Sequence, residues 1–294
     1  MKSMELGSLY QLFRDHEEVM GTSRTTIVAL QSFCDSIQKL RCPPQAFENL
    51  VLELDAVIKN TEPKIIPLVH LVEGFEAEMK PHFAKPLNEA KACALAILKQ
   101  KLALFNSAVE RLVDHGRRLI ADGDVVIAHT PSLAVRNALV SAHADLHRQF
   151  RVIVLEQHFI RIRQLIRDLA AAGIEHLVIP EYNLSHFMDT AKKLLLGATS
   201  VTPDRKVIAT IGSANIAGLC HLNGIPVYLL VNSLKFAHQS VTGQKIHKTD
   251  QMQSKENLKY TQITFSHDIV DFDLIDHVIT EEGEVPVISK FGAQ

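Results

Sequence analysis

The chain has 294 residues, 47% of them hydrophobic, and a formal net charge of -2. This length allows two domains or one large one, and the apolar fraction is enough for a substantial core, which excludes an intrinsically disordered protein. Because the charge is slightly negative and no long basic run occurs, we expect no direct binding of nucleic acid.

The cysteine spacing indicates neither a disulfide framework nor a zinc site. The four cysteines are far apart and include no C-x-x-C pair: Cys34, Cys42, Cys93 and Cys220. We therefore expect reduced thiols in a cytoplasmic protein. Residues 1–5 contain no apolar signal core, and we expect no segment long and apolar enough to span a membrane.

The first part of the chain, residues 1–119, predicts an all-helical domain. Its apolar residues recur every three or four positions, which is the period of one helix face. The predicted helices cover Ser23–Leu40, Ala46–Lys59, a run beginning at Pro63, and a stretch from Lys85 or Pro86 to Ile120 that fits one helix or two joined end to end.

The remainder, residues 120–294, predicts a Rossmann-like α/β domain. After a turn at Ala121–Asp124, short apolar runs alternate with amphipathic helices, as in a parallel sheet with helices on its faces and right-handed crossovers. The predicted strands are Val125–Ala128, Arg151–Leu155, Leu177–Ile179, Leu194–Leu196 and Ile225–Val231. The predicted helices are Leu133–His147, Ile160–Ala172, Leu184–Ala191, Ile211–Leu222 and Phe272–Thr280. Between them, the polar stretch from His238 to Tyr260 predicts a loop or arm.

Ligands of such sheets bind at the C-terminal ends of the strands. This rule places a candidate pocket at His129, Thr130 and Ser132, directly after the first predicted strand. Glu181 follows another strand and is a candidate general base, although a loop carboxylate is usually idle. Lys235 follows a later strand and is either an anion contact or a surface lysine.

Two glycine-containing segments suit a phosphate. Gly197-Ala198-Thr199 follows a strand, and Gly212-Ser213 opens a helix, where backbone N–H groups can bind an anion. The simpler interpretation is that Ser213 caps the helix and Gly212 makes the turn. We favour the simpler interpretation because no G-x-G-x-x-G or Walker sequence is present.

The residue types predict no catalytic residue, no metal ion and no cofactor. Among 15 histidines, His143 and His147 stand four apart on one predicted helix, but their charged neighbours indicate a solvated face. No serine lies in a nucleophile elbow, and no cysteine has an evident partner base.

Several short motifs nevertheless occur in a specific order. They are Gly21-Thr22-Ser23, the stretch from Ile120 to Ser132, Leu196-Gly197-Ala198, Ile211-Gly212-Ser213, Ser233-Leu234-Lys235-Phe236 and Ile279-Thr280-Glu281-Glu282-Gly283. In this order the chain resembles the family that joins the regulatory alpha, beta and delta subunits of eukaryotic translation initiation factor 2B with ribose-1,5-bisphosphate and methylthioribose-1-phosphate isomerases. The resemblance covers most of the chain.

The chain departs from the isomerases of that family at the positions of their chemistry. They use a cysteine after the first sheet strand and an aspartate after the Gly-Ala pair, where this chain has Thr130 and Thr199. Threonine hydroxyls do not ionise near neutral pH, so they cannot replace a thiol and a carboxylate in acid–base catalysis. The resemblance therefore implies a non-catalytic protein similar to the alpha-type regulatory subunits.

By the same resemblance, we expect a homodimer that contacts other initiation factor 2B-like subunits or initiation factor 2 and regulates guanine-nucleotide exchange in translation initiation. The alternative is a sensor or divergent isomerase that binds a phosphosugar or nucleotide. Its remnant pocket would consist of His129, Thr130, Ser132, Glu181, Thr199, Gly212, Ser213 and Lys235. A third interpretation is a stand-alone homologue that joins no initiation-factor complex.

Overall fold

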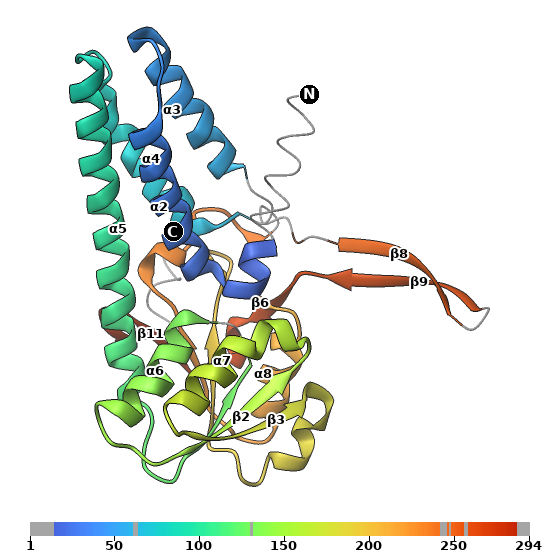
Figure 1. Ribbon diagram of the computed structural model, residues 1–294. Coiled ribbons are helices and arrows are strands. Elements are labelled where there is room, and N and C mark those ends of the chain that lie inside the picture. Colours follow the sequence, from blue (N-terminus) through green and yellow to red (C-terminus); the bar gives the residue numbers. More distant parts are fainter. Residues whose placement is uncertain are drawn as a thin grey trace.

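Figure 1 shows the computed structural model of the chain, which describes residues 15–60, 64–129, 132–241, 246, 248–255 and 258–286. A group of long helices stands above an α/β body, and a two-stranded ribbon projects to one side (Figure 1). The α/β class predicted from the sequence, with helices first and a mainly parallel sheet after them, is confirmed.

Among the described residues, the helical part includes four long α-helices, which follow a helical turn at residues 15–20. They are α2 (Thr22–Lys39), α3 (Pro44–Lys59), α4 (Ile66–Met79) and α5 (Leu87–Arg118), with a short 3-10 turn at Lys80–His82. Their apolar faces meet in one core, in which the Phe33 and Phe75 rings pack edge to face with centroids 5.2 Å apart. The spacing of apolar residues thus predicted these helices, although Pro63 lies outside the described residues and the last stretch is one continuous helix.

By length and composition alone, α5 would be able to cross a membrane, which corrects the expectation that no segment would meet this criterion. Its apolar residues have another explanation. Ala94, Leu98 and Phe105 are buried in the helical core, and Leu112 is buried in a second core against the sheet. Gly116 allows the close approach of α5 to the sheet, since an added Cβ would lie 2.7 Å from a Leu230 methyl carbon.

The main sheet has seven strands in the order β12-β11-β7-β4-β1-β2-β3. Their bounds are β1 (Val125–Ala128), β2 (Arg151–Glu156), β3 (Glu175–Pro180), β4 (Lys193–Gly197), β7 (Val227–Leu230), β11 (His277–Thr280) and β12 (Gly283–Val285). All neighbours are parallel except β11 and β12. Helices α6 (Leu133–Ala144) and α7 (Phe159–Ala171) share one core with the sheet, and α8 (Ser213–Leu222) shares the other. The central strands are therefore buried on both faces, which explains their continuous apolar runs.

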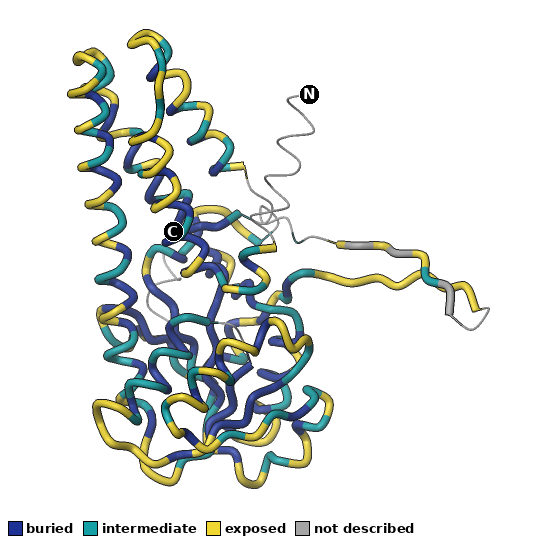
Figure 2. The backbone as a smooth tube through the Cα atoms, viewed as in Figure 1, coloured by how far each residue is buried: buried dark blue, intermediate teal, exposed yellow. Residues whose placement is uncertain are grey.

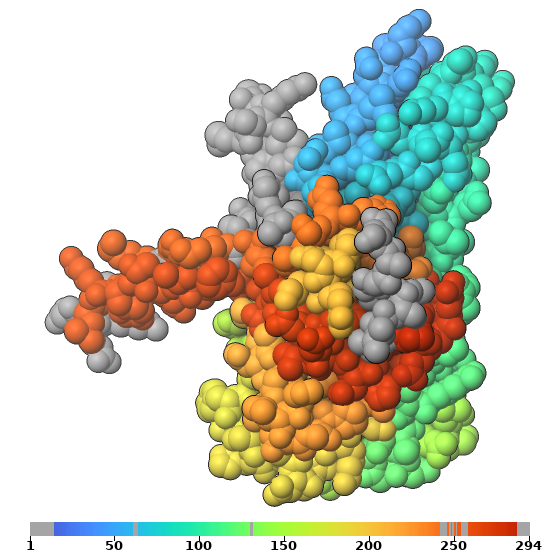
Figure 3. Space-filling model, turned by 180° about the vertical axis from the view of Figure 1, so that it is seen from behind, coloured from blue at the N-terminus to red at the C-terminus, as the bar shows by residue number. Residues whose placement is uncertain are grey.

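A second sheet and the ribbon were not predicted. Strands β5 (Ser200–Thr202), β6 (Lys206–Thr210) and β10 (His267–Asp271) form an antiparallel sheet in the order β10-β6-β5. Strands β8 (Lys248–Lys255) and β9 (Leu258–Phe265) pair only with each other among the described strands, so the predicted polar arm is a hairpin. Figure 2 shows β9 exposed along its length, and Figure 3, from behind, shows the ribbon standing clear of the body.

Two predicted helices were wrong. The stretch Phe272–Thr280 forms a 3-10 turn at Phe272–Leu274 and then β11, and Leu184–Ala191 is largely replaced by a 3-10 helix at Glu181–Phe187. In the first case, Phe272, Ile275 and Val278 are all buried at a spacing of three. A turn followed by a strand can therefore produce the apolar period of a helix.

The strand order defines where a site should lie. The chain runs outward from β1 to β2 and β3 on one side, then continues on the other side with β4 and β7. The order reverses between β1 and β4, so the loops after these strands separate and leave a crevice at their C-terminal ends.

Candidate functional site

The crevice between β1 and β4 is nearly filled by the protein itself. Its walls include Ser132 after β1 and Gly197, Ala198 and Thr199 at the end of β4, and the space that remains is about 40 Å³. This volume has room for very few water molecules. A phosphosugar would not fit without rearrangement of the side chains that line the crevice.

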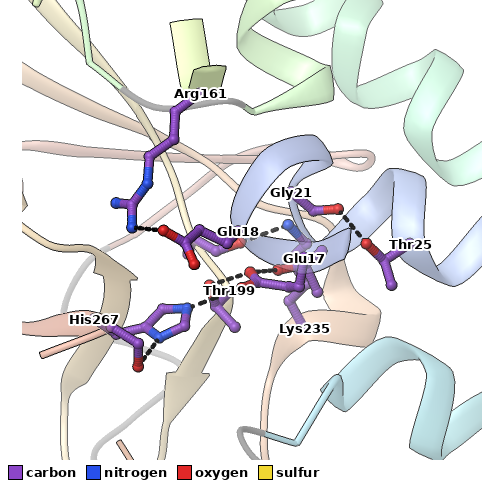
Figure 4. Close-up of polar contacts among 11 residues, drawn as sticks. Glu17, Glu18, Gly21, Thr25, Arg161, Thr199, Lys235 and His267 are labelled. Atoms are coloured by element: carbon purple, nitrogen blue, oxygen red, sulfur yellow. Dashed lines mark hydrogen bonds and ion pairs between the residues drawn. The ribbon is translucent and has the colours of Figure 1, made fainter. Parts of the chain in front are cut away.

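The carboxylate of Glu17 lies in the crevice, against Thr199 (Figure 4). Glu17 lies in a helical turn before α2, and Gly21, with φ of 75°, lets the chain bend between that turn and α2. The Oε1 atom of Glu17 accepts hydrogen bonds from Thr22 Oγ1 at 3.0 Å and from Thr199 Oγ1 at 3.2 Å. Its Oε2 atom lies 3.2 Å from Nε2 of His267, the first residue of β10.

Charge and hydrogen bonds keep Glu17 ionised despite its burial. Burial raises the pKa of its carboxyl group, but the charge of His267 and the hydrogen bonds from His267, Thr22 and Thr199 together lower that pKa to about 2. A buried carboxylate with several donors is a stable anion. The crevice therefore already contains a negative charge held by groups of the kind that would bind an anionic ligand.

Lys235 is the second charged group of the crevice. Its ammonium group donates to the carbonyl oxygen of Ala198, and its side chain is 6% exposed. Burial lowers the pKa of Lys235 to about 8, although the nearby charge of Glu17 raises it. Lys235 is thus a buried cation near the negative charge of Glu17, which belongs to the same chain.

A second polar cluster lies beside the crevice, where β1, β2 and β3 end. His129 Nε2 lies 3.0 Å from the carbonyl oxygen of Ile211, and Gln157 Nε2 donates to the same oxygen at 2.6 Å and also to Glu181. Burial lowers the pKa of His129 to about 4, the Ile211 carbonyl raises it, and Arg161 lowers it further. The ring is therefore neutral at neutral pH, and because a carbonyl only accepts, Nε2 is its donor.

Three buried atoms of this cluster have no hydrogen-bond partner among the described residues. They are His129 Nδ1, Gln157 Oε1 and Ser213 Oγ. The pKa of Glu181, in contact with Gln157, is raised by burial, lowered by the Gln157 hydrogen bond and raised again by the charge of Asp268. Buried polar atoms are almost always paired, so each of these atoms can take a partner that the described residues do not supply.

The positive end of the α8 helix dipole is already neutralised by a carboxylate of the same chain. Gly212 has φ of 90°, and an added Cβ would lie 2.2 Å from Gln157 Nε2 and 2.5 Å from a Glu181 oxygen. In the first turn of α8, the backbone N–H of Ala214 donates to Asp268 Oδ2 at 3.1 Å. A carboxylate therefore occupies the favourable position that a bound phosphate would take at this helix N-terminus.

The predicted site residues fall into two groups. Ser132, Thr199 and Lys235 line the crevice, where Ser132 also caps α6 by accepting from the Val135 N–H at 3.4 Å. The other described members belong to the neighbouring cluster: His129, Glu181, Gly212 and Ser213. Thr130 lies outside the described residues.

Sequence reasoning missed Glu17, Gln157, Arg161 and His267. Gln157 follows a predicted strand, so its position at the end of β2 was an available signal. Glu17 and His267 enter from segments remote in sequence, and no local pattern marks them. Within the described parts of the chain, no three histidine, cysteine, aspartate or glutamate side chains gather in a way that would hold a metal ion.

The family model described as the initiation factor 2 subunit family matches residues 18–287, and the chain belongs to this family. This confirms the resemblance inferred from the motifs. The chain is 25% identical over 270 residues to a Pyrococcus horikoshii protein named eIF-2B subunit 2-like, with 92% of each chain covered. It is also 26% identical over 246 residues to the ribose 1,5-bisphosphate isomerase of Pyrococcus furiosus, covering 80% of this chain and 76% of that protein.

Solved structures show the same fold. The Pyrococcus horikoshii translation initiation factor eIF-2B superposes with a TM-score of 0.80 at 22% identity, covering 98% of this chain and 99% of that one. A chain of the tetrameric eIF2B beta2-delta2 complex from C. thermophilum superposes with a TM-score of 0.69 at 18% identity, covering 98% and 92%. The family thus includes both initiation-factor subunits and isomerases.

Proposed function

We propose that this protein is a non-catalytic regulatory subunit, similar to the alpha-type subunits of initiation factor 2B, that acts in the cytoplasm by binding other protein chains. One observation supports this most directly: the carboxylate of Glu17, held by Thr199 and His267, lies in the crevice at the switch point of the sheet, where only about 40 Å³ remains. An enzyme of sugar phosphates needs that space for its substrate. Thr199, the residue after the Gly-Ala pair, contributes a hydrogen bond to Glu17 instead of an ionisable group.

The proposed partners are a second copy of the chain and other subunits of the initiation factor 2B type, with regulation of guanine-nucleotide exchange on initiation factor 2 as the outcome. Support comes from the fold, which this chain shares with chains of the beta2-delta2 tetramer. Strand β9, exposed along its length, adds surface that a partner chain would cover.

The test measures assembly and catalysis on the same purified protein. Size-exclusion chromatography with light scattering should give a mass of at least two chains, and incubation with ribose 1,5-bisphosphate should give no ketose product above the rate without protein. The Pyrococcus furiosus isomerase serves as the positive control for the assay. A monomer, or turnover of the substrate, would contradict the proposal.

The unpartnered atoms His129 Nδ1, Gln157 Oε1 and Ser213 Oγ favour a second candidate, a sensor of a phosphosugar or nucleotide. A ligand that binds only the folded state raises the apparent melting temperature. A thermal-shift series with ribose 1,5-bisphosphate and nucleoside monophosphates tests this candidate. A ligand-dependent rise in the melting temperature of the wild type that is lost in His129→Phe would support the role as a sensor. No change in the melting temperature would exclude these ligands.

A further inference from the structure

A groove lined by four arginines lies next to the crevice. It encloses about 370 Å³ between the segment before α2, the start of α2, α6 and α7. The arginines are Arg24, Arg136, Arg161 and Arg163, and Val19, Ile160 and Leu165 add an apolar lining. Neither the motifs of the sequence nor the crevice accounts for this concentration of one charge.

The positive charges of the groove outnumber the carboxylates paired with them. Arg161 Nη2 contacts Glu18 Oε1 at 2.5 Å, and Arg136 Nε lies 3.1 Å from Asp168 Oδ2. Within the described part of the chain, neither Arg24 nor Arg163 has an ion-pair partner. The groove therefore has about two uncompensated positive charges, close to the charge of a phosphate monoester near neutral pH.

Like charges also face one another across the groove. Burial lowers the pKa of Arg136, Asp168 raises it, and the charge of Arg24 lowers it again. Arg24 belongs to α2 and Arg136 to α6, so the fold itself brings these two guanidinium groups together. An anion between them would relieve this repulsion.

Arg161 supplies an independent observation. Its side chain is 8% exposed and lines both the crevice and the groove, and Figure 4 shows it extended toward Glu18. Its Nε atom is buried and has no hydrogen-bond partner among the described residues. A buried donor without an acceptor is costly, so this N–H can take an acceptor that the described residues do not supply.

We propose that the groove binds a phosphate monoester. Planar guanidinium groups match the oxygens of a phosphate in pairs, the apolar lining suits the organic part of the ligand, and the volume lies within the usual range for small-molecule sites. The phosphate belongs either to a small molecule or to a phosphorylated side chain, which present the same chemistry. This groove opens beside α2 and α7 rather than over Thr199, so the proposal is independent of the proposed function.

Isothermal titration calorimetry of the whole chain with phenyl phosphate and with a short phosphoserine peptide tests the proposal. The test variant is Arg24→Ala with Arg163→Ala, because both side chains are exposed and their removal should leave the fold intact. Arg167→Ala is the matched control, since Arg167 is an exposed arginine of α7 that does not line the groove.

The wild type and Arg167→Ala should bind phosphate monoester equally, and the double variant should bind at least about tenfold more weakly, since charge-assisted hydrogen bonds are lost. Tighter binding of phenyl phosphate would assign the site to small molecules, and tighter binding of the peptide to phosphorylated side chains. No binding by the wild type, or equal binding by the double variant, would overturn the proposal.

Discussion

The carboxylate of Glu17 lies 3.2 Å from Nε2 of His267, although these residues come from near the two ends of the described chain. Both side chains are buried, with 7% and 5% of their surfaces exposed. Glu17 thereby joins the turn before α2 to β10, and the contact closes the crevice at the end of β4. This contact thus links the helical part to the α/β body at the position where folds of this kind bind a ligand.

Replacing Glu17 by Gln should lower the free energy of unfolding by about 3 kcal/mol at neutral pH, because a buried charge with several partners is lost while shape is kept. Urea unfolding followed by circular dichroism measures the effect. Glu175→Gln is the control, since its ion pair with Arg151 is more than half exposed and should contribute under about 1 kcal/mol. Equal effects of the two substitutions would contradict the role given to Glu17.

The same carboxylate should make stability depend on acid. The folded-state pKa of Glu17 is lowered from 4.5 to about 2, so its contribution is complete above pH 4.5 and is lost as the pH falls through this window. The difference in unfolding free energy between wild type and Glu17→Gln should shrink by roughly 3 kcal/mol across it. A difference that stays constant over the pH series would show that Glu17 is not held as an anion.

Lys235 should also make stability rise with pH, but in an alkaline window. Burial lowers its pKa from 10.5 to about 8, with Glu17 opposing the shift, so the unfolded chain binds more protons between these values. The free energy of unfolding should rise with pH across this window. In Lys235→Met this rise should be smaller than in the wild type by roughly 3 kcal/mol. Chemical unfolding of both proteins at a series of alkaline pH values measures the difference. Parallel curves for the two proteins would argue against a buried ammonium group.

The sequence predicted the helices and the central strands because their apolar residues face a core at regular spacing. It could not predict β8 and β9, which are largely polar, with β9 exposed along its length. It also missed β5, β6 and β10, which have only three to five residues each. The rule that ligands bind at strand ends predicted His129, Thr199 and Lys235. It could not find Glu17 or His267, because their positions depend on packing between segments remote in sequence.

Substituting Gly212 by Ala should destabilise the cluster beside the crevice. Gly212 has φ of 90°, and a Cβ added there would collide with the side chains of Gln157 and Glu181. Gly224 has φ of 66°, but an added Cβ would have nothing within 4 Å. Gly224→Ala should therefore lower the free energy of unfolding by about 1 kcal/mol, through the strain of a positive φ alone. Gly212→Ala should lower it by about 1 to 3 kcal/mol more, because of the steric clash. Thermal unfolding of both variants measures this. Equal costs would show that Gln157 and Glu181 move aside freely.

The hydrogen bond between Thr199 and Glu17 spans 182 positions of the chain, and the contact with His267 spans still more. Closing such long loops is entropically costly, so contacts of this kind form late, whereas the β8-β9 hairpin and α5 need only nearby residues. During synthesis, a chain that has not yet reached β10 has a buried acid without its histidine partner. The contacts of Glu17 in the crevice are therefore complete only after the segments that follow it, up to β10, have folded.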